Sequence, residues 1–262
     1  MDLNTVQRVC DARTHGSWLP GDAWLGGGTY LFSEPQPHLR RLIDLSRTGW
    51  TPLRWRANGD LEIAGTCTIA QLFRGTGRSL FTQCCHAFLA SFKIWNMATV
   101  GGNLCNSLPA GPMISLTAAL DGVCLLRSPT GRERRVPVDE FITGAGENVL
   151  GEGELLRSVT LPAAALARTT AFRQASLYGF GRSGVLVIGT RDDDGSVQVT
   201  VTASTTRPIR IWFPLPPTGF ELAAAIEDAV PGDAWFDDIH GLPEWRRHMT
   251  LRLAEEIRTE LA

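Results

Sequence analysis

Two glycine-rich stretches constrain most strongly what this chain can fold into. The first, residues 24–31, carries Gly26–Gly28 after a short apolar run, and the second, residues 99–107, carries Gly101–Gly102 after a helical pattern. Consecutive glycines let the main chain approach a ligand closely and adopt positive φ, so that several N–H groups can face one set of phosphate oxygens. Both stretches suit a bound diphosphate, although a single Gly-Gly pair is more often an ordinary tight turn.

Neither stretch has the spacing of the familiar nucleotide loops. GxGxxG and the Walker pattern are both missing from the sequence, so neither a Rossmann site nor a P-loop is indicated. Thr29, Thr99 and Asn103 add short hydroxyl or amide groups that can donate further hydrogen bonds. The residues alone therefore leave a phosphate site and a pair of turns as open alternatives.

The chain up to about residue 160 has the texture of an α+β protein. Residues 53–56 and 61–64 are short runs on either side of Asn58-Gly59, which is the strongest short-range signal for a hairpin. Thr68 is suited to cap a helix that starts at residue 69, and a second helical pattern runs from about residue 80 to residue 92. We therefore expect strands and helices to be interleaved in this part.

The last third predicts a small sheet covered by helices. Residues 185–190 and 197–203 flank a turn at 192–195, and valine alternates with polar residues in the second run, which indicates an antiparallel hairpin with one buried face. Residues 244–261 carry an apolar residue at every fourth position, which predicts a helix with one apolar stripe.

Composition excludes several classes of function. A net charge of -2 gives no basic face for nucleic acid. The six cysteines form no CxxC pair and the five histidines form neither HxxxH nor HExxH, so we expect no metal site on this chain. No Ser-His-Asp or Cys-His grouping is visible, so we expect no catalytic side chain. No signal-peptide core or run of ~18 apolar residues occurs, which predicts a cytoplasmic protein without a membrane span.

The glycine stretches, in this order and separation, resemble the signature of the flavin subunits of the molybdenum hydroxylases, the xanthine dehydrogenase and carbon monoxide dehydrogenase family. Residues 26–29 resemble that family's AGGT loop, and residues 98–121 resemble its ATIGGN and SPAAD…LLALDA stretch. Residues 207–210 and 245–249 are similar to the PVR and EYRRHLA stretches of the family's C-terminal domain. The resemblance covers nearly the whole chain.

The resemblance implies an α+β fold of the vanillyl-alcohol-oxidase (PCMH) type. FAD would lie between two subdomains, about residues 1–50 and 51–160, and residues 161–262 would form a C-terminal α+β domain of the carbon monoxide dehydrogenase flavoprotein type. By position in the family, the residues expected to bind the cofactor are Trp24, Leu25, Gly26, Gly27, Gly28, Thr29, Tyr30, Leu31, Thr99, Val100, Gly101, Gly102, Asn103, Leu156 and Arg173.

The function implied is that of an FAD-binding electron-transfer subunit. In this family a large molybdopterin subunit oxidises the substrate, a small iron-sulfur subunit relays the electrons, and FAD passes them to an acceptor such as NAD, quinone or oxygen. Two alternatives stay open: a self-contained flavin oxidase or dehydrogenase, and a non-catalytic assembly subunit with a degraded flavin site. The second alternative rests on Pro112, where the family has aspartate, and on Trp95, where it has arginine.

Overall fold

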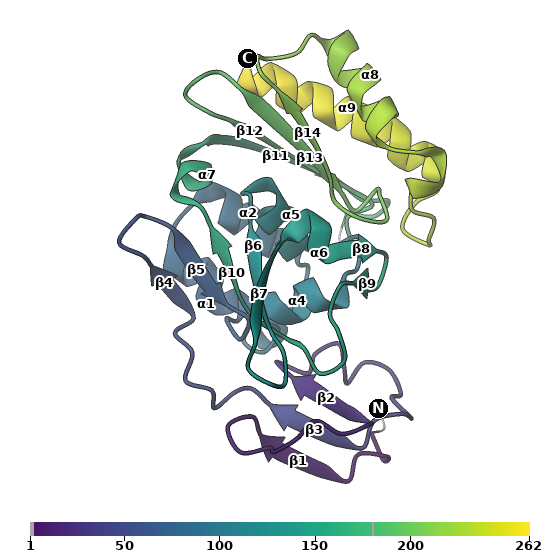
Figure 1. Cartoon of the computed structure of the whole chain (residues 1–262). Helices are drawn as coiled ribbons and strands as arrows, with labels where there is room; N and C mark the ends of the chain where they lie inside the picture. The colour runs from purple at the N-terminus through teal and green to yellow at the C-terminus, as the bar shows by residue number, and fades with distance from the viewer. Residues whose placement is uncertain (1–2, 180) are drawn as a thin grey trace.

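The computed structural model describes residues 3–179 and 181–262, and Figure 1 shows their arrangement. A small sheet at the N-terminal end is followed by a central part in which a sheet and helices pack together. A further sheet, covered by two long helices, lies at the C-terminal end. Mixed strands and helices agree with the predicted α+β class.

The N-terminal sheet is parallel, with the strand order β1-β3-β2. Its strands are β1 (Arg8–Asp11), β2 (Asp22–Leu25) and β3 (Arg41–Asp44). Both Asp11 and Leu25 pair with Asp44 in the register, so all three strands end at the same edge of the sheet. The first glycine stretch leaves the sheet from this edge.

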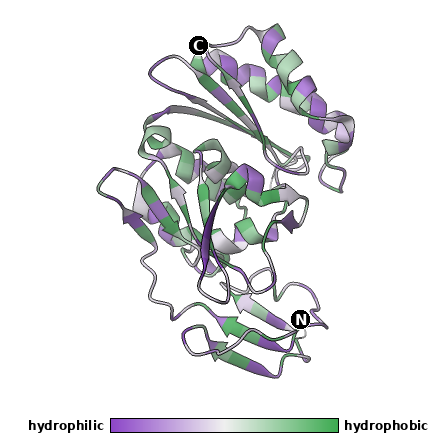
Figure 2. Ribbon diagram, in the orientation of Figure 1, coloured by the Kyte–Doolittle hydropathy of each residue, from purple (hydrophilic) through white to green (hydrophobic). Residues whose placement is uncertain are grey.

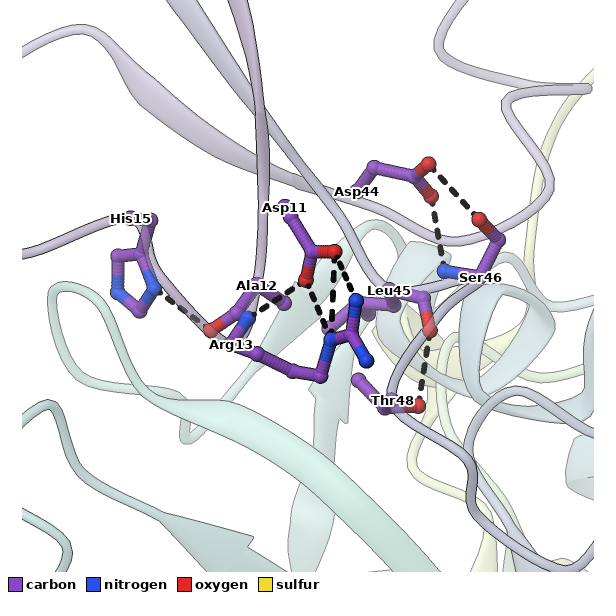
Figure 3. A network of polar contacts seen from close by, with 8 residues as sticks. All are labelled: Asp11, Ala12, Arg13, His15, Asp44, Leu45, Ser46 and Thr48. Atoms are coloured by element: carbon purple, nitrogen blue, oxygen red, sulfur yellow. Dashed lines mark hydrogen bonds and ion pairs between the residues drawn. The ribbon is translucent and has the colours of Figure 1, made fainter.

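Short polar turns stabilise the chain where β1 and β3 end (Figure 3). Asp11 accepts hydrogen bonds from the backbone N–H of Arg13 at 2.9 Å and from its guanidinium group. The bond to the Arg13 guanidinium, with the backbone bond, lowers the pKa of Asp11 to about 2. Asp44 accepts from both the backbone N–H and the hydroxyl of Ser46 at 2.8 Å. Such aspartate turns satisfy main-chain groups where the strands stop.

The central sheet is antiparallel, with the order β4-β5-β10-β6-β7. Its strands are β4 (Leu53–Trp55), β5 (Leu61–Ala64), β6 (Val123–Arg127), β7 (Glu133–Pro137) and β10 (Leu155–Leu161). The predicted hairpin around Asn58-Gly59 is confirmed by the pairing of β4 with β5. The edge strand β7 is largely hydrophilic in Figure 2, and charged side chains on an edge strand discourage pairing with another sheet.

Helices pack against this sheet and contribute to its core. They are α1 (Ile69–Thr76), α2 (Ser79–Ala87), α3 (Phe92–Trp95), α4 (Val100–Asn106), α5 (Pro112–Ala119), α6 (Val138–Phe141) and α7 (Ala163–Ala167). A two-stranded sheet, β8 (Ile142–Gly144) and β9 (Glu147–Asn148), lies beside them. Ile63 and Leu126 of the sheet share one buried cluster with Phe81 and Leu104 of the helices.

The helix starts show where the sequence prediction held and where it did not. Thr68 caps α1, as predicted, and the structure adds a reciprocal capping box with Gln71. The single helix expected from about residue 80 to residue 92 is wrong. The helix α2 ends at Ala87, Leu89 takes a left-handed φ of 44°, and the side chain of Ser91 caps the separate helix α3.

The C-terminal sheet is antiparallel, with the order β11-β12-β13-β14. Its strands are β11 (Thr169–Ala175), β12 (Val185–Arg191), β13 (Val197–Thr202) and β14 (Ile209–Phe213), and its helices are α8 (Gly219–Ala229), the 3-10 turn η1 (Gly232–Ala234) and α9 (Pro243–Leu261). The predicted hairpin of β12 and β13 and the predicted terminal helix are both confirmed.

The expectation of one buried face in this hairpin is wrong, because every residue of β13 is buried. The valines face α9, while the polar face lies against α5, which Figure 1 shows beneath the sheet. The hydroxyl oxygens of Thr202 and Ser115 lie 2.6 Å apart, and the amide of Gln198 donates to the carbonyl of Ala119 at 3.3 Å. All residues of α5 are buried as well.

Candidate functional site

The first bend, residues 26–31, leaves β2 and turns tightly. The N–H of Phe32 donates to the carbonyl of Gly28 at 2.8 Å, and Gly28 has a φ of 70°. A Cβ at Gly28 would also lie 2.6 Å from the Phe32 ring, so only glycine fits there. Within the described parts of the chain, none of the backbone N–H groups of residues 26–31 donates a hydrogen bond. These donors are therefore available to a ligand.

The second glycine stretch forms the first turn of α4 rather than the loop that the sequence suggested. Thr99 caps this helix, and its hydroxyl oxygen accepts from the N–H of Gly102 at 3.0 Å. The N–H of Gly101 donates to the carbonyl of Gly65 at 3.0 Å, and that of Val100 donates to Cys67 at 2.8 Å. The amides of the second stretch are thus already used by protein acceptors, in contrast to the expectation, whereas those of the first stretch are not.

The first stretch packs against residues 97–99, where the second stretch begins. A Cβ at Gly27 would lie 1.6 Å from the carbonyl oxygen of Met97, and a Cβ at Gly26 would lie 3.1 Å from the hydroxyl of Thr99. Consecutive glycines are required here because two main chains pass each other with no room for a side chain. This contact brings the free N–H groups of residues 26–31 beside Thr99.

A cavity of about 410 Å³ opens where the two stretches meet. That volume lies in the range of roughly 300–1,000 Å³ that small-molecule sites occupy. Every residue of 24–31 lines it, and so do Thr99, Gly102 and Asn103. The side-chain oxygen Oδ1 of Asn103 accepts from the backbone N–H of Met113 at 3.0 Å, which leaves the side-chain NH₂ group of Asn103 to donate.

Four of the predicted binding residues do not line this cavity. Val100 and Gly101 point their N–H groups at Cys67 and Gly65 instead. Leu156 is buried in β10, where it pairs with Leu126. Arg173 lies on β11 and forms ion pairs with Glu256 at 3.1 Å and with Glu260 at 2.7 Å.

The other residues that line the cavity were not predicted to bind the cofactor. They come from the turn after α2, from the segment between α4 and α5, and from the C-terminal sheet. These residues are Ser33, Ala87, Phe88, Leu89, Ala90, Ile94, Ala98, Cys105, Asn106, Leu108, Ala110, Gly111, Pro112, Arg182 and Ser183. Those from residue 98 to residue 112 lie in or beside the second motif, whereas Phe88, Leu89 and Arg182 belong to no motif and are identified only by the structure.

The cavity has few ionisable groups. Among the described lining residues there is no aspartate, glutamate, lysine or histidine, and Arg182 is the single charged side chain. Burial raises the pKa of the Cys105 thiol to about 12, so this cysteine stays protonated at neutral pH. A protonated thiol is a poor nucleophile. The cavity can therefore bind and orient a ligand, but its side chains provide no general base.

The two departures from the family pattern lie in different places. Pro112 is buried, opens α5 and forms part of the cavity wall. Trp95 packs beside the rings of Phe73 and His86, at centroid distances of 5.3 and 5.6 Å, and is not a lining residue. Only Pro112 therefore changes the chemistry of the wall.

Residues 3–179 and 181–262 contain neither a cluster of metal ligands nor a membrane-spanning helix. No group of three or more histidine, cysteine, aspartate or glutamate side chains is placed to hold a metal ion. No helix in this part of the chain has the length and apolar character needed to cross a membrane.

Comparison with known proteins gives a family and several relatives. Residues 5–164 match the family described as FAD binding domain in molybdopterin dehydrogenase. The putative xanthine dehydrogenase FAD-binding subunit XdhB of Escherichia coli (strain K12) is 30% identical over 145 residues, which is 53% of this chain and 49% of that protein. Caffeine dehydrogenase subunit beta of Pseudomonas sp. (strain CBB1) is 30% identical over 148 residues, 53% of this chain and 50% of that protein. The chain spans about half the length of these curated relatives.

Solved structures share the fold over almost the whole chain. The carbon monoxide dehydrogenase from Hydrogenophaga pseudoflava has a TM-score of 0.81 at 18% identity and covers 99% of this chain and 98% of its own. Quinoline 2-oxidoreductase from Pseudomonas putida 86 has a TM-score of 0.78 at 18% identity, with 100% and 99% covered. At these identities the likeness shows the common fold.

Proposed function

The chain belongs to the family of FAD-binding domains in molybdopterin dehydrogenases, and we propose that it holds FAD as the electron-transferring subunit of a molybdenum hydroxylase complex. One observation carries the proposal: two glycine stretches far apart in sequence meet at a cavity that the unused N–H groups of residues 26–31 adjoin. Main-chain donors at bare glycines suit a diphosphate.

Residues 24–31, Thr99, Gly102 and Asn103 would contact the cofactor, because they line the cavity. For Val100, Gly101, Leu156 and Arg173 we propose a supporting role. A Cβ at Gly65 would lie 2.3 Å from the carbonyl oxygen of Leu156, so these two residues are in close contact. The carbonyl of Gly65 in turn accepts from the N–H of Gly101. Arg173 joins β11 to α9.

The chain's residues position and shield the cofactor. When bound, FAD supplies the electron exchange, which the side chains of the cavity cannot perform. The N–H groups of residues 26–31 and the NH₂ group of Asn103 fix the phosphate end. Phe88, Leu89 and Ile94 form an apolar part of the wall, which would shield one side of the cofactor from water.

We propose two partner subunits, a large one that binds molybdopterin and a small one with iron-sulfur clusters, and an acceptor such as NAD, quinone or oxygen. The names of the two relatives described above support this, because one is an FAD-binding subunit and the other is a subunit beta. We also propose that residues 1–160 form the FAD-binding domain, with subdomains of about 1–50 and 51–160, and that residues 161–262 form the C-terminal domain. The family match, which ends at residue 164, supports that boundary.

An FAD titration of the purified full chain, followed by its visible spectrum, tests the function. One bound flavin per chain supports the proposal. Pro112 in the cavity wall favours the alternative of a degraded site, and a folded chain that binds no FAD would establish it. Bleaching of bound flavin by a substrate without any partner would indicate a self-contained dehydrogenase instead. Co-purification from the native host would identify the partner subunits directly.

A further inference from the structure

The charge of the cavity comes from the C-terminal part of the chain. Arg182 lies between β11 and β12, beyond residue 164 where the family match ends. It lines the cavity and is exposed. Within the described residues its side chain forms no ion pair, whereas Arg173 on the adjoining strand already pairs with Glu256 and Glu260. Arg182 is thus a cation without a protein partner at the mouth of the site.

The two residues that follow Arg182 are fixed by burial and by hydrogen bonds. The next residue, Ser183, is buried, and the N–H of Gly184 donates to the carbonyl of Ala175 at 2.9 Å. The carbonyl of Gly184 accepts from the guanidinium of Arg246 at 2.7 Å. Arg246 is only 1% exposed and also donates to Gly241 at 2.8 Å. A cation on an anchored segment loses less conformational freedom when it meets an anion.

We propose that Arg182 pairs with the phosphate oxygens of the cofactor, so that the C-terminal sheet completes a site whose amide donors come from residues 26–31. This inference rests on the proposed binding of FAD. Backbone N–H groups offer only partial charges to a diphosphate, while a guanidinium group brings a full positive charge and a fork of donors that matches phosphate. No other charged side chain lines the described part of the cavity.

The test compares FAD binding to the full chain and to Arg182→Gln and Arg182→Lys, followed by flavin fluorescence. Arg132→Gln is the matched control, because Arg132 is an exposed arginine in the β6–β7 turn. At low salt we expect Arg182→Gln to bind FAD about tenfold more weakly, which corresponds to about 1.4 kcal/mol. Lysine should recover part of the loss. At about 1 M salt, where the Debye length is about 3 Å, the difference should shrink.

Two further ligands show which part of FAD the charge of Arg182 acts on. ADP should lose affinity for Arg182→Gln by the same factor as FAD, and riboflavin, which has no phosphate, should bind both proteins alike. Equal FAD binding by the glutamine variant and the original chain overturns the inference, as does a loss that salt leaves unchanged. A loss shared by riboflavin also overturns it, because the charge would then act on the flavin ring. If the original chain binds no FAD, the proposed function fails together with this inference.

Discussion

The contact between the two glycine stretches can be broken by a single methyl group. In Gly27→Ala the new Cβ would lie 1.6 Å from the carbonyl oxygen of Met97, whereas real Cβ contacts stay beyond 3.0 Å. The two main chains must therefore separate by about 1.4 Å, the difference between these distances. A separation of this size takes an N–H out of hydrogen-bond range of a phosphate oxygen, and a hydrogen bond to a charged group contributes about 1.5–3 kcal/mol, roughly 10- to 100-fold in affinity. We expect FAD affinity to fall by at least that order.

The fold should survive this change. Overpacking of one methyl group costs about 1–3 kcal/mol, while a domain has about 5–15 kcal/mol of stability. Thermal unfolding followed by circular dichroism should thus show a lower but cooperative transition, and flavin fluorescence should report the lost binding.

Two other glycines provide the comparison. Gly232→Ala adds a methyl group with no atom within 4 Å, so we expect neither binding nor stability to change. Gly26→Ala meets only the side chain of Thr99 at 3.1 Å, so its effect should be intermediate. If Gly27→Ala binds FAD as tightly as Gly232→Ala, the contact between the stretches does not shape the site and our reasoning is refuted.

Three further changes have defined outcomes. Thr99→Ala removes the cap of α4 and should lower the free energy of unfolding by about 1 kcal/mol, with Thr99→Ser retaining most of it, as measured by denaturant titration. The Cys105 thiol, whose pKa burial raises to about 12, should resist alkylation at pH 8 in the native chain and react after unfolding, as mass spectrometry of the labelled peptides would show. Asp11, whose pKa the bonds with Arg13 lower from 3.8 to about 2, contributes stability above pH 3.8 that is lost as the pH falls toward 2. Asp11→Asn should therefore be less stable than the original chain at neutral pH, and acid titrations should show the gap closing in that window.

Local signals explain what the sequence predicted well. The Asn58-Gly59 turn and the Thr68 cap depend on neighbours in sequence, and both are found as expected. The glycine stretches predicted a close approach of the main chain to a ligand, and at Gly27 the structure shows a close approach between two segments of the chain itself. Patterns that reflect only nearby residues are the ones that a sequence can reveal.

The remaining features depend on segments far apart in the chain. The polar face of β13 is buried because α5 packs on it, and the alternating pattern of β13 contains no trace of that partner. The amides of Val100 and Gly101 are unavailable because carbonyl groups at Cys67 and Gly65 accept from them. Arg182 likewise reaches the cavity from a strand connection without a motif. None of these contacts can be recognised from the sequence without the tertiary structure.

The complete burial of α5 has a consequence for how the protein can be divided. A helix covered on every side belongs to both neighbouring layers, and α5 contacts β12 and β13 as well as α2. A fragment that stops at residue 164, where the family match ends, would leave the hydroxyl of Ser115 and the apolar residues around it open to water. Such a fragment should aggregate, so we expect the two parts to fold as one piece.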